Sequence, residues 1–215
     1  MLFSKSIKFI AACLILYASY LLLLLSIPYL EIKPNIEFLL TKQFVYHIDI
    51  WRWAFYIHVY SSIFVIVSGL FQFSKYLINK KPKIHKFSGY VYIIFLLLIS
   101  GPGGLIMSFY ANGGILAQTS FVILSILWIS FTLYAFILVK KQKYIKHGKW
   151  LLRSYALTLS AVMLRFYLLL FDYFRLNIGP VESYIIVAYA SWIPNLIFAE
   201  ILIRKGFIEK LFQKN

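Results

Sequence analysis

The chain has 215 residues, of which 62% are hydrophobic and only 13% are charged. Soluble domains are about half apolar and about a quarter charged, so this composition excludes an ordinary soluble protein. The formal net charge of +15 does not indicate a nucleic-acid partner, because the basic residues gather in short clusters between long apolar runs.

Apolar runs of about 18 residues or more predict transmembrane helices. Six runs qualify, at about 9–30, 53–74, 87–109, 116–139, 150–171 and 183–203. Their apolar residues occur on every face, which is typical of helices surrounded by lipid or by other helices. The first run is too long for the apolar core of a signal peptide and is expected to remain as a helix. We therefore expect an all-α fold in which residues 1–215 form a single domain, a bundle of six transmembrane helices.

Two lysine clusters predict the orientation of the bundle. They comprise Lys75, Lys80, Lys81, Lys83 and Lys86, and then Lys140, Lys141, Lys143, Lys146 and Lys149. With the N-terminus inside, sixteen Lys and Arg fall on the inner side and four on the outer side. Basic residues of short loops stay on the cytoplasmic side, which predicts an N-in, C-in protein of the bacterial cytoplasmic (inner) membrane. The clusters should also attract anionic lipid head groups, at about 1 kcal/mol per basic residue.

Ionisable side chains inside a membrane are costly and mark candidate functional sites. At 100° per residue, one face of the fifth helix carries a polar or small stripe. The stripe consists of His147, Ser154, Thr158, Ala161, Arg165 and Asp172. Ser154 and Thr158 are expected to join helices through hydrogen bonds. Arg165 has two interpretations, either an ion pair with Asp172 or Asp49, or a ligand site shared with His58.

Depth along the helices sorts the polar residues into two clusters. The inner cluster is expected to contain His85, His147, Arg153 and Glu200. The outer cluster is expected to contain His58, Arg165 and Asp172, close to the Gly101-Pro102-Gly103-Gly104 segment. Because proline and glycine interrupt helices, that segment should disrupt the third helix.

Several chemistries fit these clusters. Two histidines at one depth on separate helices can ligate a haem iron, with arginines near the propionates. His85 and His147 are then the metal ligands, haem b is the candidate cofactor, and His58, Arg153 and Arg165 complete the candidate cofactor-binding set. A proton relay or a quinone site uses the same histidines. Zinc is less favoured because ligands other than histidine are scarce and the single Cys13 provides no thiolate cluster.

The order of the motifs resembles a bacterial membrane-protein family, catalogued as domain of unknown function 2306. The resemblance rests on His58, Gly69–Phe73, His85–Tyr92, Gly101–Gly104, Trp128, His147–Thr158, Arg165, Trp192, Asn195 and Glu200. It covers about residues 50–203 and implies a polytopic membrane protein. It also implies that His58, His85, His147, Arg153 and Arg165 are family-type positions. It supplies no reaction. Lys86 stands where the family more usually has Arg, and Leu151 where it has Met.

Three functions follow from these observations, in order of preference. The first is a small redox or proton-coupled membrane component with a site lined by histidine and arginine, of the haem b or quinone type. The second is a non-catalytic subunit or lipid-interacting scaffold of a larger membrane complex, with partner membrane subunits. The third is a small-solute transporter, for which the sequence offers no inverted repeat. None of the three fixes whether the protein is an enzyme.

Overall fold

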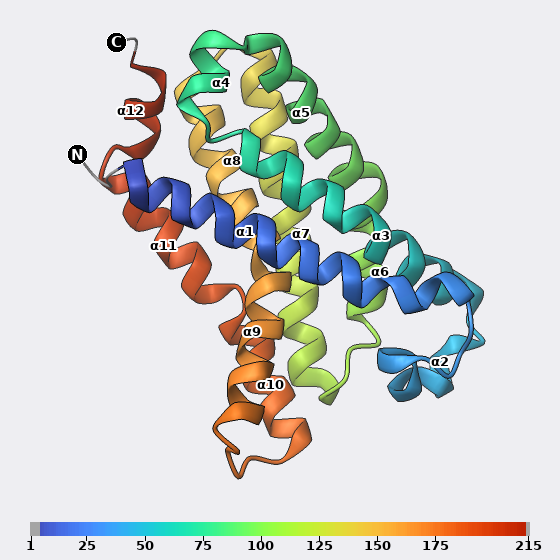
Figure 1. Cartoon of the computed structure of the whole chain (residues 1–215). Helices are drawn as coiled ribbons and strands as arrows, with labels where there is room; N and C mark the ends of the chain where they lie inside the picture. Colours follow the sequence, from blue (N-terminus) through green and yellow to red (C-terminus); the bar gives the residue numbers. More distant parts are fainter. Residues whose placement is uncertain (1–4, 214–215) are drawn as a thin grey trace.

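The structure is a computed structural model that describes residues 5–213, and these residues are almost entirely helical (Figure 1). Within them, six helices are long and apolar enough to cross a membrane, as the sequence predicts. They are Phe9–Glu31, Asp49–Phe71, Pro82–Ser108, Gly114–Lys140, Tyr144–Tyr173 and Pro180–Arg204. The fifth begins at Tyr144 rather than near residue 150, because the lysine-rich segment before the apolar run is already helical.

Several spans consist of more than one helical element. The elements are α1 (Lys5–Ser26) with η1 (Ile27–Glu31), α3 (Asp49–Phe71), α5 (Pro82–Ile94) with η3 (Phe95–Ser100) and α6 (Gly101–Ser108), α7 (Gly114–Lys140), α8 (Tyr144–Thr158) with α9 (Ser160–Tyr173), and α10 (Pro180–Ala190) with α11 (Ile193–Arg204). Short helices complete the fold: η2 (Glu37–Lys42), α2 (Gln43–Tyr46), α4 (Lys75–Lys80) and α12 (Phe207–Phe212).

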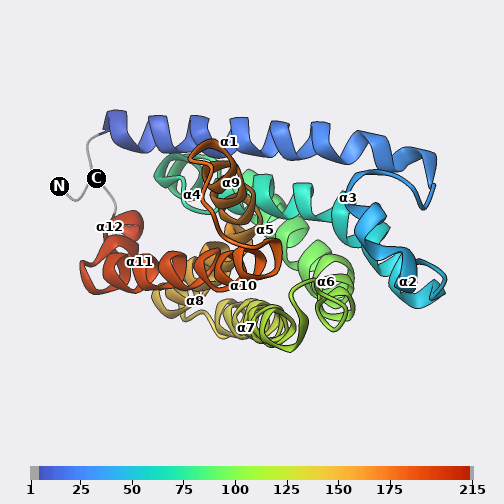
Figure 2. The ribbon, with the colours of Figure 1, turned by 90° about the horizontal axis from the view of Figure 1, so that it is seen from below.

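Helix α1 lies along one side of the bundle, as Figure 2 shows, and contacts α3 and α9. In the most apolar stretch of the first span, Phe9–Glu31, only 17% of the residues are buried, against 44% in that of the second span, α3. Its exposed side chains include Phe9, Leu14 and Leu25. Large apolar residues exposed on a membrane-spanning helix face lipid rather than water, so α1 is the most peripheral of the six spans.

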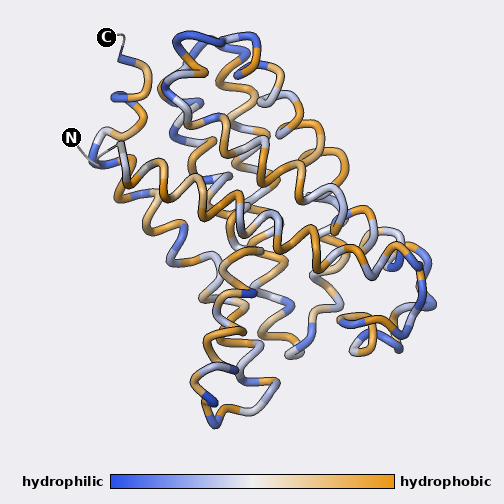
Figure 3. The backbone as a smooth tube through the Cα atoms, in the orientation of Figure 1, coloured by the Kyte–Doolittle hydropathy of each residue, from blue (hydrophilic) through white to orange (hydrophobic). Residues whose placement is uncertain are grey.

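Both lysine clusters lie at one end of the molecule, together with α4, the α7–α8 turn, the start of α1 and α12 (Figure 1). We call this the basic end. Figure 3 shows hydrophilic residues gathered in the turns, with apolar helices between them. Lys214 and the side chains of Lys5 and Lys8 are outside the described part of the chain. That the basic end faces the cytoplasm stays a prediction.

The expected disruption of the third span at Gly101–Gly104 is not found, because the helix continues through that segment as α6. The irregularity falls just before it, where Phe95–Ser100 forms a π-helical turn. Pro102 has no backbone N–H, and the wider turn absorbs the missing hydrogen bond. A Cβ on Gly101 would lie 2.5 Å from the Leu96 carbonyl oxygen, so the tight backbone approach requires glycine there.

The fifth and sixth spans bend near their middles. Thr158 Oγ1 donates to the Ser154 carbonyl at the end of α8, a bond that can bend a helix. In the sixth span, Pro194 interrupts the backbone ladder between α10 and α11. The far halves, α9 and α10, pack together and extend away from the basic end (Figure 1). Beyond the bend of the fifth span, α9 lines a cavity together with residues of the other five spans.

A buried hydroxyl network joins α5, α7 and α8 in the core. Tyr92 Oη lies 2.6 Å from Ser154 Oγ and 2.9 Å from Thr158 Oγ1, and Trp128 Nε1 donates to Thr158 Oγ1 at 2.8 Å. Thr132 Oγ1 lies 2.6 Å from Ser154 Oγ and donates to the Trp128 carbonyl. Two of its hydroxyls donate to backbone carbonyls, Thr158 to that of Ser154 and Thr132 to that of Trp128. The network therefore uses its hydroxyl protons in contacts within the protein. Ser154 and Thr158 therefore join helices, as predicted.

Candidate functional site

A cavity of about 450 Å³ lies in the half of the molecule away from the basic end. Its wall contains residues from all six spans and from the segment that connects the first two. Most of the lining is apolar or aromatic. The polar lining side chains are Ser26, Tyr29, Glu37, Lys42, His58, Ser62, Ser125, Thr158, Ser160, Arg165 and Tyr184. A mostly apolar chamber with few convergent polar groups is the usual form of a small-molecule site.

His58 is held in one orientation at the cavity wall. Its Nδ1 lies 2.7 Å from the Ser100 carbonyl, and because a carbonyl only accepts, Nδ1 carries the proton in this contact. In the neutral ring, Nε2 is then the basic nitrogen, and no described residue offers it a hydrogen bond. A Cβ on Gly104 would lie 2.9 Å from the ring, and one on Gly103 would lie 3.2 Å from the His58 Cβ. Both glycines therefore make room for this histidine.

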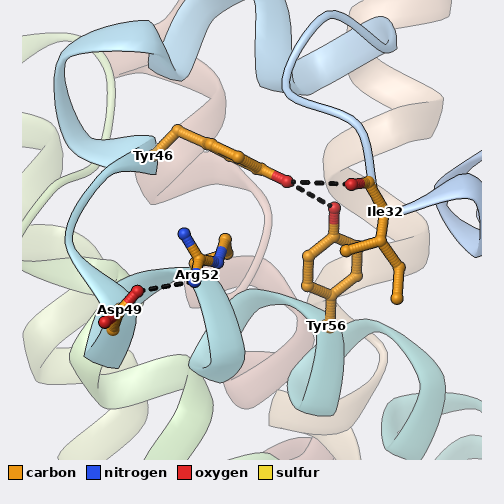
Figure 4. A network of polar contacts seen from close by, with 5 residues as sticks. All are labelled: Ile32, Tyr46, Asp49, Arg52 and Tyr56. Carbon is orange, nitrogen blue, oxygen red and sulfur yellow. Dashed lines mark hydrogen bonds and ion pairs between the residues drawn. The ribbon is translucent and has the colours of Figure 1, made fainter.

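Arg165 lines the same cavity, and no carboxylate of the described residues forms an ion pair with it. Asp49 is occupied by Arg52, whose Nη2 lies 2.5 Å from Asp49 Oδ1 (Figure 4). Asp172 is exposed and makes no ion pair within the described residues. The Arg165 guanidinium donates to the Ala161 carbonyl of its own helix at 2.9 Å. The interpretation of Arg165 as half of a structural ion pair is therefore wrong. The other interpretation was a ligand site shared with His58, and the two residues do line the same cavity.

Two tyrosines, Tyr29 and Tyr184, line the cavity together with Arg165, and they come from the first and sixth spans. Neither hydroxyl is within hydrogen-bonding distance of the guanidinium. Since a guanidinium carries five N–H donors and stays charged at ordinary pH, most of its donors remain available to an occupant of the cavity.

Lys42 is a lining residue that the sequence analysis does not single out. It is 5% exposed, and its Nζ donates to the Tyr110 carbonyl and to Asn112 Oδ1, both at 2.5 Å. The Nζ also lies 5.3 Å from the centre of the Phe38 ring. Burial lowers the pKa of Lys42 to about 8 from its ordinary 10.5. Position 42 lies in a connecting segment, where sequence reasoning treats a lysine as solvated. Its apolar neighbours Phe38, Leu39 and Leu40 were the only signal that could have revealed it.

His85 and His147 line a second, small pocket of about 10 Å³ at the basic end. His147 Nδ1 donates to the Ala135 carbonyl at 2.8 Å, whereas His85 Nδ1 is buried and receives no hydrogen bond from any described residue. The pocket has room for about one water molecule. Side chains of Leu151, Ile208, Leu211 and Phe212 fill the surrounding space. These residues do not fit a haem, because a porphyrin ring between the two imidazoles would collide with them.

Arg153, the other candidate at this depth, does not line the histidine pocket. Its guanidinium forms a two-pronged ion pair with Glu200 on α11, with Nε on Oε1 and with Nη2 3.0 Å from Oε2. It also stacks 4.5 Å above the Trp150 ring. Arg153 is therefore a link between α8 and α11. Among the residues that the structure describes, no group of three His, Cys, Asp or Glu side chains is placed to hold a metal ion.

A model of the DUF2306 family, described as predicted membrane protein, matches residues 55–203. The chain belongs to this family. No curated protein and no solved structure gives a significant match. The match includes all five residues of the candidate cofactor-binding set, which are His58, His85, His147, Arg153 and Arg165, whereas Lys42 lies outside it. The DUF2306 protein is thus an integral membrane protein, and its candidate site combines residues of the matched segment with residues that precede it, among them Tyr29, Glu37 and Lys42.

Proposed function

We propose that this DUF2306 protein is a small proton-coupled membrane component that binds an amphipathic ligand in the large cavity. The ligand's head group presents oxygen acceptors to Arg165 and exchanges a proton with His58. Quinones are the redox-active members of this ligand class. The observation that supports the proposal is the placement of Arg165, which lines the same mostly apolar cavity as His58 and pairs with no carboxylate of the described residues.

Arg165 and His58 have different roles in this proposal. Arg165 keeps its charge and can donate to a carbonyl, carboxylate or phosphate oxygen of the head group. His58, with its Nδ1 proton on the Ser100 carbonyl, presents Nε2 as an acceptor for a hydroxyl proton of the ligand, such as that of a reduced quinone. The aromatic wall, which includes Trp51, Phe55 and Trp128, suits an apolar ring or tail.

Ligand titration in detergent tests this proposal. Trp51 and Trp128 line the cavity, so a quinone bound there should quench tryptophan fluorescence. We expect saturable quenching by a ubiquinone or menaquinone analogue in the unchanged protein, and at least tenfold weaker binding in Arg165→Gln. Arg204→Gln, at the basic end, is the matched control and should bind normally. Equal binding by Arg165→Gln and the unchanged protein would overturn the proposal.

A non-catalytic scaffold is the second candidate, and the helix-joining contacts favour it. The Arg153–Glu200 pair and the hydroxyl network around Tyr92 both connect separate spans. A scaffold requires no ligand in the cavity, so the same titration distinguishes the two functions. Binding of partner subunits, and of lipid head groups at the lysine clusters, is compatible with both proposed functions.

A further inference from the structure

Two cationic side chains reach the cavity from different parts of the chain. Arg165 comes from α9, and Lys42 comes from the end of η2, in the connection between the first two spans. Tyr29 and Phe38 line the same cavity as the two cations. The Tyr29 hydroxyl accepts the Phe38 N–H at 3.3 Å, and the centre of the Phe38 ring lies 5.3 Å from Lys42 Nζ. One lining carboxylate, Glu37, is present, and it forms no ion pair with either cation in the described part of the chain.

We infer that Lys42 and Arg165 together bind an anionic head group, so that the cavity selects amphiphiles bearing a carboxylate or a phosphate over neutral amphiphiles of the same shape. The inference rests on the proposed function, since it names the ligand class of the same site. We call the two residues the cation pair.

The contacts of Lys42 leave it able to bind a ligand. An ammonium group has three donors, and two are used by the Tyr110 carbonyl and Asn112 Oδ1. Both acceptors are neutral, so the positive charge stays uncompensated. A buried charge without a counter-charge is unfavourable, and an anion that takes the third donor relieves that cost. Lys42 is therefore a second head-group contact rather than a surface lysine.

The charge balance of the cavity also favours an anion. The titratable lining side chains besides the cation pair are Tyr29, Glu37, His58 and Tyr184. With Glu37 ionised and the tyrosines and His58 neutral, the lining carries one net positive charge. A singly charged head group brings the site to neutrality. Contacts of this charged kind change affinity by about tenfold to hundredfold each.

The pH dependence of binding separates the two cations. The pKa of Lys42 is about 8, whereas Arg165 stays charged throughout the working range. Affinity for an anionic amphiphile should therefore fall as pH rises from 7 to 9.5. In Lys42→Arg, whose side chain keeps its charge, the fall should be absent.

Matched amphiphiles provide the test on the full-length protein. The anionic members are oleate and phosphatidic acid, and the neutral members are oleyl alcohol and diacylglycerol, compared by quenching competition at pH 7. The oleate and phosphatidic acid arms distinguish a carboxylate from a phosphate head group. We expect each anion to bind at least tenfold more tightly than its neutral counterpart, and Lys42→Met to lose most of that preference. Asn112→Ala, like Lys42→Met, removes the Lys42–Asn112 hydrogen bond, but it keeps the positive charge of Lys42. It should therefore retain the preference for anionic amphiphiles.

The outcomes separate this inference from the proposed function. One outcome is that neutral quinones bind and their binding depends on Arg165, while anionic amphiphiles bind no more tightly than neutral ones and Lys42→Met changes no affinity. In that case the proposed function stands and the inferred role of the cation pair is wrong. If no amphiphile binds, both are wrong. If Lys42→Met does not fold, the pH profile decides, since a fall in affinity that persists in Lys42→Arg overturns the inference.

Discussion

Gly104 of α6 lies against the imidazole of His58 on α3, so closely that a Cβ at position 104 would be 2.9 Å from both Cε1 and Nδ1 of the ring. Real Cβ atoms do not approach a ring this closely, and the His58 Nδ1 is fixed by the Ser100 carbonyl. The third span thus shapes the cavity wall by leaving out a side chain where the histidine needs space.

This contact makes Gly104→Ala a test of the position of His58. The added methyl group should displace the ring from the Ser100 carbonyl, lowering stability by about 1–3 kcal/mol, as overpacking does. Ligand affinity should fall as well. In a His58→Ala background the same substitution should cost little stability, because the ring that it meets is gone. Thermal unfolding of the four proteins of this cycle measures the coupling, and equal costs in both backgrounds would contradict the contact.

Arg153→Ala should destabilise the bundle, because it leaves Glu200 without its partner between α8 and α11. The pair is only partly exposed, so the loss should be roughly 1–3 kcal/mol, below the cost of breaking a fully buried pair. Arg153→Met combined with Glu200→Gln removes both charges and should recover part of the stability. Melting temperatures in detergent check this. A double variant less stable than Arg153→Ala would show that the pair matters for another reason.

The fold follows from the sequence far more directly than the site does. Run length and lysine position depend on local composition, so the six spans could be predicted, with errors at the ends such as Tyr144. Helical periodicity also placed His58 and Arg165 at one depth. Whether Arg165 meets Asp49, Asp172 or a cavity depends on how separate helices pack. Lys42 depends on how a connecting segment folds back over the bundle. Periodicity contains neither kind of information.

The histidine pocket predicts a spectroscopic result. Because the space between His85 and His147 is about 10 Å³ and α12 borders it, the purified protein should show no Soret band that depends on these two residues. An absorption spectrum of the detergent-solubilised protein, compared with those of His85→Ala and His147→Ala, checks this. A band that disappears in both variants would restore haem ligation at this pair, and would require α12 to move.

Attachment of α12 should depend on pH through its ion pair with α8. Glu209 Oε1 lies 2.6 Å from Lys149 Nζ, and this hydrogen bond lowers the pKa of Glu209 below its ordinary 4.5. The pair's contribution is therefore present above pH 4.5 and is lost as pH falls through the lowered pKa. It should be about 1 kcal/mol or less, since both side chains are partly exposed to solvent. The protection of the Phe207–Phe212 amides against hydrogen exchange, taken relative to the intrinsic exchange rate at each pH, should be lower at pH 3 than at pH 6. Lys149→Met should show the lower protection already at pH 6.

The orientation of the bundle is the last prediction. The basic end carries both lysine clusters, the start of α1 and α12, and the opposite end carries few basic residues. Short basic loops are retained in the cytoplasm during insertion, so this end should face the cytoplasm, and the cavity should lie nearer the outer surface. A reporter fused after Asn215 that is active only in the cytoplasm should be active, and one active only in the periplasm should be silent. Replacing the five lysines from Lys140 to Lys149 by glutamine should weaken the bias, whereas the same number of arginine replacements should preserve it. A periplasmic signal from the unchanged chain would reverse the whole assignment and place Arg165 and Lys42 near the cytoplasmic surface.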